Sequence, residues 1–254
     1  MTSASETLRA QAAAVRMLHD PAFAAAVRAT PDVALPDLSP SLRAQLAAVD
    51  PRALQLDRLR GRRLLRTLFD EYKAATTLLL ARCKQLAFLD RFFAHAAFVD
   101  AVAGRRPLYD AYFAFLVDAG VPREVAVIEH ALAAARRSMS ATKAAPPGHL
   151  DRAPGVQPVA TTAGALATLQ AAERYLFEVG LMPAVALCDD APSLQLDEPT
   201  RDPTPLYLVT VPNESGHALV TIEAPLHALL ESLPRPFVPA LQPLVDDELA
   251  VVVR

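Results

Sequence analysis

Apolar side chains recur with helical spacing through the first half of the chain. Between residues 62 and 81 they return every three or four positions, which turns one continuous face toward a core. That face consists of Leu64, Leu65, Leu68, Phe69, Tyr72, Ala75 and Leu79. The same spacing is present over residues 85–102, 107–120 and 122–137. The pattern predicts a helical bundle over residues 1–142.

Proline marks where the earliest helices begin. Asp20-Pro21, Ser39-Pro40 and Asp50-Pro51 each place a capping side chain before a proline, whose missing N–H costs nothing in the first helical turn. We therefore predict helices over residues 4–18, 21–29, 40–49 and 52–80, with the last one broken near Gly61.

The pattern changes twice in the second half of the chain. Residues 143–160 are rich in proline and small residues and show no periodicity, which predicts a linker. A helix is expected next from Thr162 to Val179, because Gly180 follows its last apolar position. Residues 161–254 are expected to form a small α+β domain.

A β-hairpin is the main β signal in that domain. Two β-rich runs, 206–211 and 218–222, flank the turn-forming stretch Pro-Asn-Glu-Ser-Gly-His. A short helix is expected over 225–233, with further strands over 248–253 and 182–188. The predicted fold class is α+β, with a mostly helical N-terminal bundle followed by a small α+β domain that contains the hairpin.

Charge is distributed unevenly along the chain. Residues 1–150 carry 20 Lys and Arg against 14 Asp and Glu, whereas residues 151–254 carry 5 against 14. The acidic C-terminal part disfavours nucleic acid as a partner of the whole chain, because duplex binders need a strong basic field. The first residues do not resemble a signal peptide, no apolar run is long enough to cross a membrane, and the two cysteines lie far apart. We therefore expect a cytoplasmic protein.

The side chains offer little catalytic or metal chemistry. The chain has no glycine-rich phosphate loop and no G-x-S-x-G motif, and none of its 6 histidines pairs with another one helical turn away. Glu129-His130 lacks a second ligand one turn away, so a solvated or capping role is expected. Cys83 lies between two basic residues, but a structural helix cysteine is favoured over a nucleophile. We expect no catalytic residue, no cofactor and no metal in this chain.

One segment, DRLRGRRLLR, is densely basic, and on a helix its arginines cover much of the polar face. A solvated face, a phosphate-contacting patch and a docking surface for an acidic partner are all compatible with it. The basic pair at 105–106 precedes the next helix and would extend a docking surface. The candidate docking residues are Arg58, Arg62, Arg66, Arg105, Arg106 and Tyr109.

The hairpin suggests a different kind of surface. A small sheet with an open edge accepts an extended peptide as an added strand. The first hairpin run is the candidate edge, so the candidate peptide-binding residues are Leu206, Tyr207, Leu208, Val209, Thr210 and Val211. The equally weighted alternative is an edge covered by a neighbouring helix.

The order of four segments resembles a known family. RRLLRTLFDEYKAATTLLLA, DAYFAFLVDAG and REVAVIEHALAAARR are followed, after the predicted linker, by TPLYLVTVPNESGHALVTIEAPLHALLESL. Over residues 55–140 and 200–235 this order is similar to the partner proteins of multinuclear non-haem iron oxidative enzymes in ribosomal peptide natural-product biosynthesis. The methanobactin-type partner subunit is one of them, and related helical proteins are labelled DNA-binding domains. The resemblance lies in helix pattern and element order, and no motif aligns residue by residue.

The resemblance implies a non-catalytic accessory subunit. Its helical part would dock on the iron-dependent enzyme as a heterodimer, and its α+β part would bind the leader of the precursor peptide by strand addition. The alternative is a DNA-binding or regulatory protein that uses the basic cluster from Arg58 to Arg66. A stand-alone enzyme would need a convergent polar site, which these residues do not supply.

Overall fold

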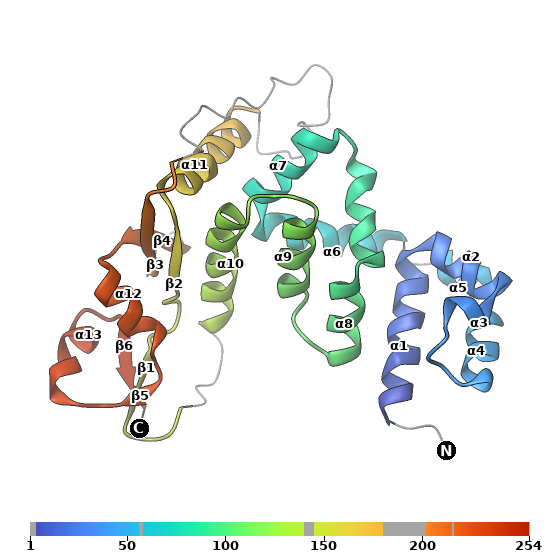
Figure 1. The fold of residues 1–254 in the computed structure, drawn as a ribbon, viewed down its shortest axis with the longest axis horizontal. Helices are drawn as coiled ribbons and strands as arrows, with labels where there is room; N and C mark the ends of the chain where they lie inside the picture. Colours follow the sequence, from blue (N-terminus) through green and yellow to red (C-terminus); the bar gives the residue numbers. More distant parts are fainter. Residues whose placement is uncertain (1–3, 56–57, 140–144, 180–201, 215, 254) are drawn as a thin grey trace. The chain divides into compact units, whose positions relative to one another are not determined.

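A computed structural model describes residues 4–55, 58–139, 145–179, 202–214 and 216–253 (Figure 1). These residues divide into two compact units. The first unit takes the residues up to 70 and 79–120, and the second takes 71–78, 121–179 and 202–253. The units are not two consecutive halves of the chain, because residues 71–78 belong to the second unit.

The first unit is helical. Its elements are α1 (Ala4–His19), α2 (Pro21–Ala29), α3 (Pro31–Ala34), α4 (Pro40–Ala47), α5 (Pro51–Gln55), α6 (Arg58–Glu71), α7 (Lys73–Cys83), the 3₁₀ helix η1 (Leu86–Ala94), α8 (Ala96–Gly104) and α9 (Leu108–Asp118). The last residue of α6 and the first residues of α7, up to residue 78, belong to the second unit. The α1–α4 core is aliphatic and includes Met17, Val27 and Leu38. A second, aromatic core centres on Phe92, whose ring centroid lies 5.1 Å from those of Phe98 and Tyr112. The predicted helical class of this region is confirmed.

Two predicted helices are interrupted at places that the pattern did not indicate. The helix expected over 52–80 runs through Gly61 within α6 and breaks instead at Tyr72, between α6 and α7. The helix expected over 85–102 is a 3₁₀ helix followed by α8, with the break at His95. The ring Nδ1 of His95 accepts the Ala97 N–H at 3.3 Å, so this side chain caps the new helix start.

The second unit combines helices with two antiparallel three-stranded sheets. Its elements are α10 (Arg123–Ser138), β1 (His149–Arg152), β2 (Pro158–Thr162), α11 (Ala163–Glu178), β3 (Pro205–Asn213), β4 (Gly216–Thr221), α12 (Ala224–Glu231), β5 (Arg235–Pro236), the 3₁₀ helix η4 (Pro239–Leu241), α13 (Gln242–Asp246) and β6 (Ala250–Val252). The strand orders are β5-β1-β6 and β2-β3-β4. The hairpin, the helix that follows it and the last strand are confirmed, while the strand expected over 182–188 lies outside the described residues.

The larger sheet is covered on both faces. Leu208 and Val209 are both buried, and as neighbours on β3 they point to opposite faces. Leu208 joins a core with residues of α10 and α11, among them Ile128 and Leu169. Val209 joins a different core built from α12 and the smaller sheet. Figure 1 shows α10 and α11 near β2, β3 and β4.

The predicted linker over 143–160 is wrong for its described part. Residues 149–152 and 158–162 are strands β1 and β2, and a turn with Gly155 at φ +83° joins them. Proline is tolerated at the first residue of a strand, and Pro158 occupies that position in β2. The boundary expected at residue 142 also differs from the structure, because α10 belongs to the second unit.

Candidate functional site

The candidate edge strand is the central strand of its sheet. Leu206–Val211 lies in β3, which pairs with β2 on one side and with β4 on the other. Its backbone groups are therefore engaged on both sides, and the prediction of an open edge at residues 206–211 is wrong. The hairpin pattern in the sequence predicts two strands of this sheet. The third strand, β2, lies in the region predicted as a linker.

Strand β4 forms one edge of this sheet among the described residues. The Ile222 N–H donates to the Tyr207 carbonyl at 2.9 Å, which makes 207 and 222 a hydrogen-bonded pair. Hydrogen-bonded and non-hydrogen-bonded pairs alternate along an antiparallel ladder. The register pairs Thr210 with Leu219 and Leu208 with Thr221, so these two β4 residues occupy non-hydrogen-bonded positions. Their backbone N–H and C=O groups, with those of His217, face away from β3.

Nothing in the β4 sequence protects this edge. Residues 216–221 read GHALVT and contain no proline and no Lys, Arg, Asp or Glu, and the register with β3 runs without a bulge. Charges, prolines and bulges are the usual means of blocking strand addition. Val220 is 45% exposed, and Thr221 is also exposed. The geometry thus presents about three outward-facing residues as a template for an extended chain.

The opposite edge, β2, differs in this respect. The Thr210 N–H donates to the Gln157 carbonyl at 3.0 Å, so Pro158, Ala160 and Thr162 face outward from the sheet. Pro158 has no N–H to offer. Thr162 is the N-cap of α11, where its hydroxyl accepts the Ala165 N–H at 3.2 Å. The two edges are therefore unequal, and β4 is the one suited to strand addition.

The acidic residues Glu214 and Glu223 lie beside the two ends of β4, and both are exposed. His217 on the strand has a lowered pKa because burial and the nearby Arg136 both disfavour its charged form. Arg136 thus places a positive charge near His217, whereas Glu214 and Glu223 place negative charges at the two ends of β4, where basic residues of a partner are favoured.

The candidate docking residues do not form one patch. The side chain of Arg58 lies outside the described part, while Arg62 and Arg66 are exposed on α6. Arg62 lies near Asp90. Burial raises the pKa of the Asp90 carboxyl, and the charge of Arg62 partly offsets this rise. The start of α6 adjoins the C-terminal end of α1, where a Cβ on Gly61 would lie 3.0 Å from His19 Nδ1.

The remaining candidates, Arg105, Arg106 and Tyr109, follow the end of α8, and the first two are exposed. Arg105 is the left-handed C-cap of α8, with φ at 51°. Arg105 lies beside Leu8 on α1. Leu8 precedes His19 by 11 residues, and this separation corresponds to about 16 Å along a helix. The two basic groups therefore lie near opposite ends of α1.

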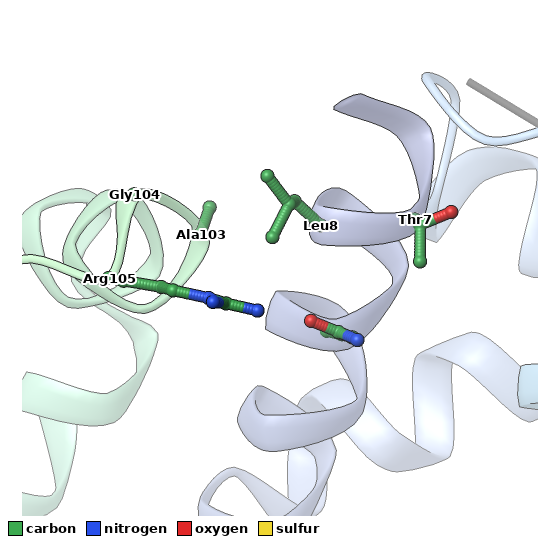
Figure 2. Close-up of a pocket in the computed structure, with 6 residues that line it drawn as sticks. Thr7, Leu8, Ala103, Gly104 and Arg105 are labelled. Atoms are coloured by element: carbon green, nitrogen blue, oxygen red, sulfur yellow. The ribbon is translucent and has the colours of Figure 1, made fainter. Parts of the chain in front are cut away.

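An open groove of about 550 Å³ lies between α1 and the end of α8. Figure 2 shows the Arg105 side chain extending from α8 toward α1, with Leu8 and Ala103 facing the groove. Thr7, Gln11 and Gly104 complete the described lining. With a single exposed charge and no buried polar group aimed into it, the groove has no feature that selects a ligand.

A buried carboxylate lies between α10 and the start of α7. Glu129 on α10 is 6% exposed and accepts the N–H groups of Ala74 and Ala75, each at 2.8 Å. The capping role expected for Glu129-His130 is thereby confirmed for Glu129. Next to it, Tyr72 Oη and His130 Nδ1 are hydrogen-bonded at 2.8 Å. Sequence alone did not indicate which helix start receives the cap.

Within the described residues, no three or more His, Cys, Asp or Glu side chains gather as they would around a metal ion. None of the described helices is both long and apolar enough to cross a membrane. Cys83 is a half-buried free thiol, and Cys188 lies outside the described residues.

Comparison with known proteins yields no relative. No family model matches the sequence, and neither the curated proteins nor the solved structures contain a match.

Proposed function

We propose that this chain is a non-catalytic accessory subunit that binds an extended peptide along β4. In this proposal the peptide is the leader of a ribosomal precursor. The partner is a cytoplasmic iron-dependent oxidative enzyme that forms a heterodimer with the helical unit. The iron enzyme and the precursor enter through the resemblance described above, whereas the binding mode rests on the sheet.

The observation that carries the proposal is the unprotected edge of β4. Backbone groups at 217, 219 and 221 face away from β3, and an added strand would supply their hydrogen-bond partners. Each such backbone bond contributes about 0.5–1.5 kcal/mol net. Three residues of strand pairing are therefore compatible with a reversible complex whose selectivity comes from side chains.

The two ends of β4 favour basic residues in a partly apolar peptide. Glu214 and Glu223 lie at its two ends, and the chain from 151 onward has 14 acidic against 5 basic residues. Val220 offers an exposed apolar contact on one face of the edge. Leader residues that alternate between apolar and basic would match both features.

Docking of the enzyme is assigned to the helical unit. Arg62 and Arg66 form one basic group and Arg105 with Arg106 forms the other, and both pairs are exposed. An acidic partner would contact one group or the other, since the two lie near opposite ends of α1. Charge reversal at each pair in turn would identify the group involved.

Replacing Thr221 with proline tests the peptide site directly. The Thr221 N–H faces away from β3, so Thr221→Pro removes an outward donor while leaving the β3–β4 ladder intact. We expect a synthetic peptide with the sequence of the precursor leader to bind about tenfold more weakly. One backbone hydrogen bond is lost, and a carbonyl of the bound peptide is left without a partner. Calorimetric titration gives the dissociation constant.

Thr221→Val is the matched control, because valine keeps the N–H and suits an exposed strand position. Its affinity should stay within about twofold of the wild type, in line with the small effects of most surface substitutions. Equal affinities for the proline and valine variants, both folded by circular dichroism, would place the peptide elsewhere.

A further inference from the structure

The start of α7 is held by a carboxylate from another helix. Both oxygens of Glu129 on α10 accept first-turn N–H groups of α7, those of Ala74 and Ala75, at 2.8 Å. These N–H groups have no partner within their own helix. The contact therefore joins residues 55 positions apart and lies just after the point at which α6 gives way to α7.

The carboxylate is buried. Ala74 and Ala75, whose N–H groups it accepts, are fully buried, and Glu129 itself is 6% exposed. The charged groups that act on Glu129 are Glu173 on α11, which repels its charge, and Arg136 on α10, which attracts it. Lys73, the first residue of α7, attracts the charge of Glu173. Burial thus opposes ionisation, and two backbone donors and one arginine favour it.

Burial outweighs the donors and raises the pKa of Glu129 to about 7. An accessible glutamate titrates near 4.5. A group whose pKa is raised in the closed structure binds its proton more tightly there than in an opened one. The contribution to the closed form is therefore fully present below pH 4.5 and is lost as the pH rises through about 7.

We propose that Glu129 makes the contact between α10 and the first turn of α7 a proton-sensitive anchor, which is tightest when the carboxyl carries a proton and loosens when it is ionised. A neutral carboxyl keeps its carbonyl oxygen as an acceptor for one α7 N–H and avoids the cost of a buried charge. An ionised carboxylate accepts from both donors but gains more by becoming hydrated when the first turn opens. The hydrogen bonds of this anchor involve no residue of β4.

Amide hydrogen exchange in the intact chain measures this opening directly. The readout is the protection factor of the Ala74, Ala75 and Thr76 amides, corrected for the intrinsic pH dependence of exchange. Between about pH 6 and about pH 8 we expect protection to fall about tenfold in the wild type. Amides of α9, in the first unit, serve as an internal reference and should not follow this trend.

Glu129→Gln cannot ionise, so its protection factors at these amides should be independent of pH. Glu124→Gln is the matched control, because Glu124 is an exposed glutamate on the same helix and should leave the wild-type trend unchanged. If Glu129→Gln does not fold, the ¹³C chemical shift of the Glu129 carboxyl in the wild type gives its pKa without a variant. Protection that is constant or rises with pH, or a carboxyl that titrates at its ordinary value, would overturn the proposal.

Discussion

Thr210 shows how one side chain ties the central strand to the turn before β2. It is fully buried on β3, where its hydroxyl donates to the Gly155 carbonyl at 2.7 Å and accepts the Gln157 N–H at 2.8 Å. Both partners belong to the segment between β1 and β2. The hydroxyl therefore fixes the stretch that leads into β2, and with it the order of strands that leaves β4 at the edge.

Thr210→Val should destabilise the second unit by about 1–3 kcal/mol, because valine preserves the shape and leaves the half-buried Gln157 N–H and the buried Gly155 carbonyl without the hydroxyl. Denaturant unfolding followed by circular dichroism measures this change in the free energy of unfolding. Thr221→Val is an exposed strand control and should change it by less than about 0.5 kcal/mol. Equal stability of the two variants would mean that the hydroxyl does not hold the turn.

Among the helices, starts with the same sequence pattern differ in the group that caps them. Asp20 Oδ1 accepts the Phe23 N–H at 2.9 Å, so it caps α2 as predicted. Ser39 precedes α4 in the same pattern, but its hydroxyl makes no capping bond and is buried without a partner among the described residues. Its backbone N–H donates instead to Glu6 Oε1 at 2.7 Å. The local pattern therefore locates a helix start without determining what caps it.

Alanine substitutions at these two positions should differ in effect. Asp20→Ala should lower the free energy of unfolding by about 1 kcal/mol through loss of the cap. Ser39→Ala keeps the N–H to Glu6 and removes an unpaired hydroxyl, so it should be neutral within about 0.5 kcal/mol or slightly stabilising. Thermal melts of the two variants beside the wild type compare them. A larger loss for Ser39→Ala than for Asp20→Ala would contradict this assignment of the caps.

Elements with local signals could be predicted from the sequence. The hairpin, α11 and the proline-initiated helices each depend on residues close together in the chain. The break at Tyr72 could not, because the residue that caps the helix after it, Glu129, lies on a different helix. The strands β1 and β2 were missed for a related reason. Their segments are short and proline-rich, and they become strands by pairing with β6 and β3 far along the chain.

At the scale of the whole molecule, the position of the peptide edge depends on strand β2, which the local sequence pattern does not predict. The sequence predicts the peptide edge on β3, because its pattern indicates only two strands of this sheet. Adding β2 makes β3 central and leaves β4 at the edge. The second unit likewise includes α10 and residues 71–78, so its hydrophobic core draws on a region that was predicted to belong to the helical bundle.

Size-exclusion chromatography of this chain with the iron-dependent enzyme and a fluorescent leader peptide tests the accessory role and the peptide site together. We expect one heterodimer peak that carries the peptide, with the iron belonging to the partner enzyme. With Thr221→Pro we expect the same heterodimer with the peptide largely lost. Elution of the wild-type chain apart from the enzyme would contradict the accessory role, and equal peptide retention by wild type and Thr221→Pro would contradict binding along β4.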